Sequence, residues 1–112
     1  NYVSWAGFKE NIYHELAKKY FKDGFGSVFT FSLKSGYEGA IQLVENCNLI
    51  SHLANVGDTR SLIVHPASTT HRQLSNEQKE KSGVGDSIIR LSIGLESHKD
   101  IIADLEGALS TI

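Results

Sequence analysis

One arginine interrupts a segment that otherwise predicts an apolar strand, Ile88-Ile89-Arg90-Leu91-Ser92-Ile93. Successive side chains of a strand point to opposite faces, so Arg90 lies on the face opposite to Ile89, Leu91 and Ile93. A guanidinium group binds a carboxylate through two parallel hydrogen bonds, which a lysine cannot do. Arg90 is therefore a candidate anchor for an anionic ligand. The alternation alone favours an arginine that is solvated or paired within the fold over one that binds a ligand.

Histidine and cysteine residues lack the spacing of a metal site. The five histidines fall on separate predicted segments, and the single cysteine, Cys47, has no second cysteine with which to bind zinc. We therefore predict no metal-binding residues. We interpret Cys47 as a small buried side chain and His71 as a structural residue.

Three common catalytic motifs are also missing from this sequence. It contains no nucleophile elbow, no Walker-type phosphate loop and no zinc-protease helix. Asp100 and Asp104 have helical spacing, which is typical of a solvated helix face. The residues alone thus indicate a domain that binds a small molecule or a partner and carries no catalytic residue of its own.

The elements that would position Arg90 follow from the hydrophobic period along the chain. Apolar residues at helical spacing predict a helix over 8–20, and strict alternation predicts a strand over 27–33. Two capping boxes, Ser35–Glu38 and Ser75–Gln78, predict the starts of two further helices. Other predicted elements are strands over 49–54, 61–64 and 87–93, and a last helix capped by Ser97 with a buried face of Ile101, Ile102, Leu105, Ala108 and Leu109.

These elements predict one domain, 1–112, of the α+β class: a mostly antiparallel sheet of about four strands, with a meander in the middle and helices packed mainly on one face. A net charge of −2 without any basic run argues against nucleic acid or an anionic membrane as the main partner. No signal-peptide pattern and no apolar run of about 20 residues is present. We therefore expect a cytoplasmic protein.

Three stretches of this chain together resemble a known family. They are Ser-His-Leu-Ala-Asn-Val-Gly-Asp at 51–58, Ser-Leu-Ile-Val-His-Pro-Ala-Ser-Thr-Thr-His at 61–71, and a third stretch made of residues 85–86, 89–96 and 100–105. They resemble the C-terminal domain of the Cys/Met-metabolism enzymes that use pyridoxal phosphate (PLP), the small domain of fold-type-I PLP enzymes. Within that family, the turn 55–58, the ending 67–71 and the strand Phe29-Thr30-Phe31 are most similar to O-acetylhomoserine sulfhydrylases. Relatives that make or cleave cystathionine usually carry Ser-Leu-Gly-Gly at the turn instead.

The resemblance implies that two domains have different roles in the enzyme. In this family a large N-terminal domain holds PLP on a lysine, which is outside this chain, and the C-terminal domain closes one wall of the active site. Arg90 falls on the position that binds the carboxylate of the amino-acid substrate, and Asn55 on a position that helps to seat it. No cofactor-binding residue is implied here, and the isolated chain is expected to be inactive.

The resemblance also implies a reaction and an assembly. The parent enzyme would be a homotetramer that replaces the acetate of O-acetylhomoserine with sulfide or a thiol in methionine biosynthesis, with PLP as the electron sink. Two alternatives stay open. One is another enzyme of the family, a cystathionine γ-synthase or a γ-lyase; the other is a free-standing, non-catalytic domain that binds amino acids or a partner protein.

Overall fold

A five-stranded sheet lies at the centre of the fold. The computed structural model describes residues 2–112, apart from the side chains of Asn76 and Glu80. The strands are β1 (Val3–Ser4), β2 (Val28–Ser32), β3 (Ser51–His52), β4 (Leu62–Val64) and β5 (Ile88–Ser92), in the spatial order β1-β2-β5-β4-β3. The helices are α1 (His14–Tyr20), α2 (Gly36–Asn46), α3 (Asn76–Lys81) and α4 (His98–Leu109), with a 3-10 helix at Pro66–Ser68.

The sheet confirms the α+β class and differs from the prediction in two details. Three strand pairs are antiparallel, but β3 and β4 pair in parallel, with Ser51 opposite Leu62. The predicted meander is therefore wrong, because the loop 53–61 carries the chain back to the level at which β3 began, as a parallel pair requires. The fifth strand is β1, whose two residues are too few to show an alternating pattern.

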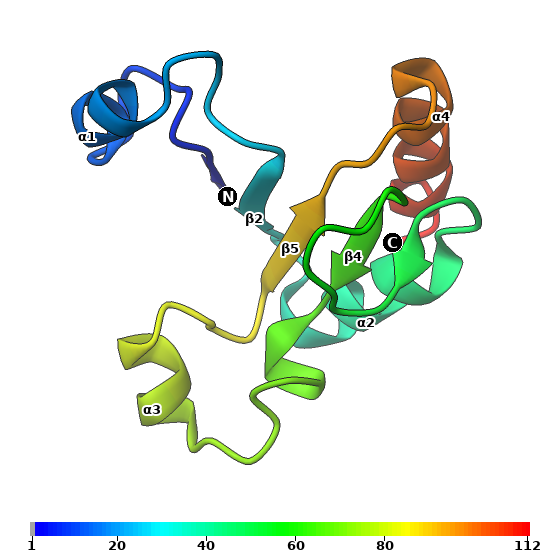
Figure 1. The fold of residues 1–112 in the computed structure, drawn as a ribbon. Helices are drawn as coiled ribbons and strands as arrows, with labels where there is room; N and C mark the ends of the chain where they lie inside the picture. Colours follow the sequence, from blue (N-terminus) through cyan, green and yellow to red (C-terminus); the bar gives the residue numbers. More distant parts are fainter. Residues whose placement is uncertain (1) are drawn as a thin grey trace.

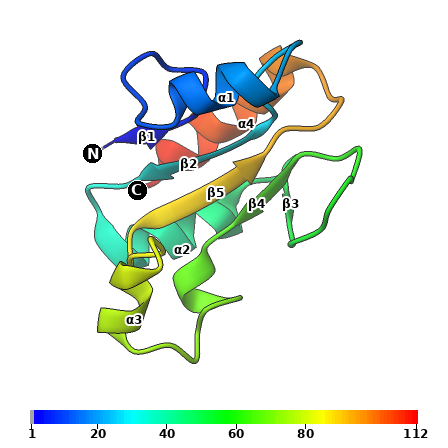
Figure 2. The ribbon, with the colours of Figure 1, turned by 60° about the vertical axis from the view of Figure 1, so that its left-hand side comes forward.

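Two helices cover one face of the sheet, as predicted. Figure 1 shows α2 and α4 side by side on this face, and Figure 2 shows α1 and α3 at opposite ends of the sheet. The core between the sheet and these two helices consists of Ala40, Leu43, Val44, Ile50, Ile63, Ile89, Leu91, Ile101 and Ala108. Ile102 and Leu109, predicted to be buried, are 52% and 43% exposed because only the stripe through Ile101 and Ala108 faces the core. None of the described helices has the length and apolar composition needed to cross a membrane.

Only one of the two predicted capping boxes forms. The Ser75 amide donates to Gln78 Oε1 at 2.9 Å, and the Gln78 amide donates to Ser75 Oγ at 3.3 Å. Ser35 instead has helical backbone angles (φ −73°, ψ 0°), and its side chain does not cap α2, since capping needs an extended residue at this position. Ser97 precedes α4 as predicted but also makes no side-chain cap hydrogen bond.

The first helix is shorter than its hydrophobic spacing predicts. It begins at His14, and the residues before it form turns. Asn11 Oδ1 accepts a hydrogen bond from the Tyr13 amide at 2.9 Å, and the His14 ring lies 2.8 Å from the carbonyl oxygen of Ala6. Such local side-chain bonds offer the backbone an alternative to the helical ladder.

His65 belongs to the architecture of the fold. It is 1% exposed, and its Nε2 donates to the carbonyl oxygen of Asp86 at 2.8 Å while Nδ1 lies 2.9 Å from Ser68 Oγ. The ring of Tyr37 packs edge-on against it at 5.0 Å. Burial lowers the pKa of His65, and this effect outweighs the opposing influence of Asp86. The histidine thus ties the segment before β5 to the end of β4.

We expect the stability of the fold to depend on the protonation of His65. Because its folded-state pKa lies below the ordinary value of 6.5, the unfolded chain binds the proton more readily. The contribution to the free energy of unfolding is complete above about pH 6.5 and is lost as the pH falls from there towards the lowered pKa. Urea midpoints measured across this range should fall less steeply for His65→Gln than for the unmodified chain. His98→Gln, at an exposed position at the start of α4, should keep the original slope. Equal slopes for all three proteins would contradict the prediction.

Candidate functional site

Arg90 lies at the middle of the sheet. It is on β5, in register with Thr30 of β2 on one side and Val64 of β4 on the other. Its neighbours along the strand, Ile89 and Leu91, are fully buried in the core beneath α2 and α4. Arg90 therefore points away from these helices, as the alternation predicts.

The guanidinium group of Arg90 has no partner in the described part of the chain. Arg90 is half-buried, yet it forms neither a hydrogen bond nor an ion pair with the described residues. Its five N–H donors are therefore available to a ligand. Its neighbours on the same face are Thr30, Val64, Ile88 and Ser92, none of which is acidic. An unpaired cation beside buried apolar groups favours an anionic ligand, because partial desolvation strengthens the attraction between charges.

Asn55 lies in the exposed loop between β3 and β4, where its side chain bonds to its own turn. Its Nδ2 donates to Asp58 Oδ2 at 3.1 Å, and its Oδ1 accepts from the Val56 amide at 2.9 Å. Asp58 also accepts from Nε and Nη2 of Arg60, which holds the pKa of this carboxyl well below its usual range. The structure does not join Asn55 to Arg90 by a hydrogen bond. One N–H of the Asn55 amide remains available to a ligand.

A buried serine connects the Asn55 loop to the strand of Arg90, and the sequence analysis missed it. Ser61 is 0% exposed, and both its amide and its hydroxyl donate to the carboxylate of Glu96, at 2.8 and 2.7 Å. The Gly94 amide donates to Ser61 Oγ at 2.9 Å. We call Ser61, Gly94 and Glu96 the Ser61 clamp. Neither helical nor strand spacing relates residues that are more than thirty positions apart, so only the fold could reveal it.

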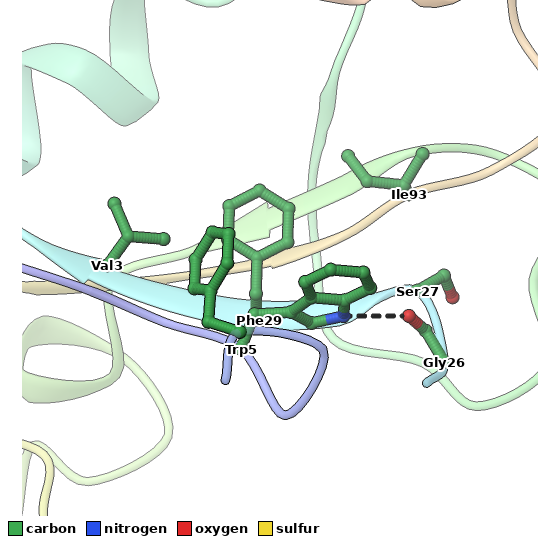
Figure 3. A pocket seen from close by; sticks show the side chains of 7 residues that line it. Val3, Trp5, Gly26, Ser27, Phe29 and Ile93 are labelled. Carbon is green, nitrogen blue, oxygen red and sulfur yellow. Dashed lines mark hydrogen bonds between the residues drawn. The ribbon is translucent and has the colours of Figure 1, made fainter. Parts of the chain in front are cut away.

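A largely apolar pocket opens at the edge of the sheet, on the face away from Arg90. Its volume is about 410 Å³, and it is lined by Val3, Trp5, Phe8, Gly26, Ser27, Phe29 and Ile93. Figure 3 shows the Trp5 indole beside Phe29, with its nitrogen donating to the carbonyl oxygen of Gly26 at 3.0 Å. Val3 pairs with Phe31 and Phe29 with Leu91, which places the pocket on the face of the core. No charged side chain lines it, so it offers no carboxylate site.

Asp104 is a structural residue and not part of a solvated face, which corrects the prediction. Its carboxylate accepts hydrogen bonds from the amides of Asn48, Leu49 and Ile50, at 2.8, 3.1 and 3.0 Å. Because the amides of residues 49 and 50 are engaged there, β3 is shorter than the predicted strand over 49–54. Asp100, by contrast, is exposed.

Cys47 is half-buried, and it follows the last residue of α2. Burial, and then the charge of Asp104, raise the pKa of its thiol to about 11. It is therefore protonated at neutral pH and a poor nucleophile or metal ligand. The described residues form no cluster of three or more side chains suited to a metal ion.

The fold agrees with comparisons to known proteins. Residues 1–110 match the family model described as Cys/Met metabolism PLP-dependent enzyme. The chain is 50% identical to O-acetyl-L-homoserine sulfhydrylase 1 of Thermus thermophilus over 97% of its own length and 26% of that protein. It is 46% identical to an L-methionine gamma-lyase of Fusobacterium nucleatum subsp. polymorphum, over 98% of this chain and 28% of that protein.

A solved structure gives the same result. The chain matches a putative O-acetylhomoserine (thiol)-lyase of Campylobacter jejuni, which contains a pyridoxyl-lysine phosphate, with a TM-score of 0.89 and 44% identity over 98% of this chain and 26% of that one. This chain belongs to the family of Cys/Met-metabolism PLP-dependent enzymes, which confirms the predicted family. It spans about a quarter of the length of these relatives.

The residues of this chain do not fit PLP itself. The only buried lysine among the described residues is Lys79, and its ammonium group lies 3.7 Å from the carboxylate of Asp86. A lysine that holds a cofactor must present a free amine to a pocket, and Lys79 does not line the pocket described above. The other lysines are exposed. We therefore assign no cofactor contact to this chain.

Proposed function

We propose that residues 1–112 form the C-terminal domain of an O-acetylhomoserine sulfhydrylase and bind the carboxylate of its amino-acid substrate. The observation that carries the proposal is the unpaired guanidinium group of Arg90 on the open face of the sheet. The 50% identity to a sulfhydrylase supports the choice within the family. The net reaction replaces the acetate of O-acetylhomoserine with sulfide, so that one carbon–oxygen bond breaks and one carbon–sulfur bond forms.

Arg90 would hold the substrate carboxylate through two parallel hydrogen bonds, and the free N–H of Asn55 would add a third. Fixing one end of the amino acid in this way places its reacting carbon in a constant position. Such positioning accelerates a reaction by removing the entropy of orientation from the chemical step. The role of this chain is thus to bind and orient, and the PLP chemistry belongs to the rest of the enzyme.

A partner domain is supported by the apolar side chains that this chain exposes. Three apolar side chains in and next to α1 are largely exposed: Ile12, which precedes the helix, is 86% exposed, and Leu16 and Tyr20 within it are 52% and 67% exposed. Exposed apolar patches mark surfaces that another protein surface covers. We propose that a large N-terminal PLP domain covers part of this surface in a cytoplasmic homotetramer, and that the isolated chain is inactive.

Another reaction within the family is the second candidate. The 46% identity to a methionine γ-lyase is close to the 50% identity to the sulfhydrylase, so γ-elimination is favoured almost equally by similarity. The Arg90 site would serve either reaction, since both substrates are α-amino acids.

The test is an assay of the full-length protein against competing substrates. We expect homocysteine and acetate from O-acetylhomoserine and sulfide, with kcat/KM about tenfold or more above that for methionine elimination or for O-succinylhomoserine with cysteine. Preference for methionine would identify a γ-lyase, and preference for the succinyl ester with cysteine a cystathionine γ-synthase. Binding of amino acids without turnover would support a non-catalytic binding domain and contradict the proposal.

A further inference from the structure

The Ser61 clamp occupies the junction between the strand of Arg90 and the loop of Asn55. Gly94 and Glu96 follow the last residue of β5, and Ser61 precedes the first residue of β4. Besides its bonds to Glu96 and Gly94, Ser61 accepts a hydrogen bond from the Ser51 amide at 3.0 Å through its carbonyl oxygen. One buried residue thus holds the end of β5, the start of β4 and the start of β3 together.

The backbone between Ser61 and Arg60 continues into a series of hydrogen bonds that reaches Asn55. Arg60, next to Ser61, donates from its amide to Asp58 at 2.9 Å and from its guanidinium group at 3.1 and 2.9 Å. Asp58 in turn accepts from Asn55 Nδ2. The Leu95 amide also donates to the carbonyl oxygen of Thr59 at 2.9 Å, which gives a second link between the two segments.

We infer that Glu96 is a positioning residue, which fixes the Asn55 turn (residues 55–58) relative to Arg90 so that both can bind one carboxylate. Its carboxylate is the only acidic group that bonds to Ser61 in the described part of the chain, and both of its oxygens are used. Hydrogen bonds to an ionised acceptor are short and strong, which suits a joint that must keep a constant geometry. Glu96 itself need not touch the substrate. This inference rests on the proposed function, because it assumes that Arg90 and Asn55 share a ligand.

The inference is tested by steady-state kinetics of the full-length enzyme with Glu96→Ala, Asn55→Ala and the double variant. We expect Glu96→Ala to raise KM for the amino-acid substrate about tenfold while kcat changes by less than about threefold. KM for sulfide should stay unchanged, because sulfide has no carboxylate. The double variant should be no more than about twofold worse than Asn55→Ala, since residues that act through one another are not additive. Glu106→Ala, at an exposed position of α4, is the matched control and should resemble the unmodified enzyme.

Glu96→Gln keeps an acceptor oxygen for the Ser61 amide, so it should give an intermediate KM, and it serves if the alanine variant fails to fold. An unchanged KM for the amino acid, or effects of Glu96→Ala and Asn55→Ala that multiply, would overturn the inference. Arg90→Ala distinguishes failure of the proposed carboxylate site from failure of the positioning role of Glu96. If Arg90→Ala leaves KM for the amino acid unchanged, the proposed carboxylate site itself is wrong. If Arg90→Ala raises it and Glu96→Ala does not, only the positioning role is wrong.

Discussion

Replacing Arg90 with alanine in the full-length enzyme should lower kcat/KM for the amino-acid substrate by about a thousandfold. Alanine removes two charge-assisted hydrogen bonds and leaves the substrate carboxylate facing apolar groups such as Val64 and Ile88, which are 4% and 9% exposed. A carboxylate without a partner in such surroundings is strongly disfavoured. The measurement is the initial rate of homocysteine formation as O-acetylhomoserine is varied at saturating sulfide.

Two further variants make this result specific. Arg90→Lys keeps the charge but loses the planar fork, so we expect an intermediate loss of about a hundredfold. Arg72→Ala removes an exposed arginine elsewhere in the chain and should leave kcat/KM within about twofold of the unmodified enzyme. If Arg72→Ala and Arg90→Ala lowered kcat/KM equally, the effect would come from the net charge of the protein, and Arg90 would not be a carboxylate anchor.

The second large effect concerns stability. Leu91→Ala should lower the free energy of unfolding of the 112-residue chain by about 3 kcal/mol. Leu91 is 0% exposed and packs in the core with Ile63 and Ile89, so the substitution leaves a cavity that the rigid sheet cannot close. Urea unfolding followed by circular dichroism gives the free energy of unfolding.

Ile102→Ala is the matched control for this experiment. It removes an apolar side chain of similar size from a position that is 52% exposed, so we expect a loss of less than about 1 kcal/mol. A comparable loss at both positions would contradict the assignment of the buried faces of α4 and β5.

Features that depend on a strand with one buried face could be predicted from the sequence. The orientation of Arg90 follows from the alternation of β5 because a shift of one residue would expose Ile89 and Leu91. The capping box of Ser75 and Gln78 was likewise within reach of sequence reasoning, because all of its partners lie within four consecutive residues.

Features that depend on contacts between distant segments could not be predicted. Asp104 looks like a surface residue by its spacing, but it bonds to amides more than fifty residues earlier in the chain. The same holds for the bond between Ser61 and Glu96, which joins two loops that only the sheet brings together. At Ser35 the sequence predicted a contact that does not form. Ser35 and Glu38 have the residue types and spacing of a capping box, but the backbone of Ser35 has helical angles that prevent capping.

The backbone contact at Gly94 has a mechanical consequence. A Cβ atom built on this residue would lie 2.3 Å from the carbonyl oxygen of Thr59 and 2.6 Å from the Ser61 nitrogen, so the two chain segments touch with no side chain between them. Side chains between two segments act as a compliant layer that absorbs small displacements by changing rotamer. With no such layer here, a displacement of the 53–61 loop is passed directly to the end of β5. We therefore expect the junction to act as a stiff coupling, so that the loop and the strand move together.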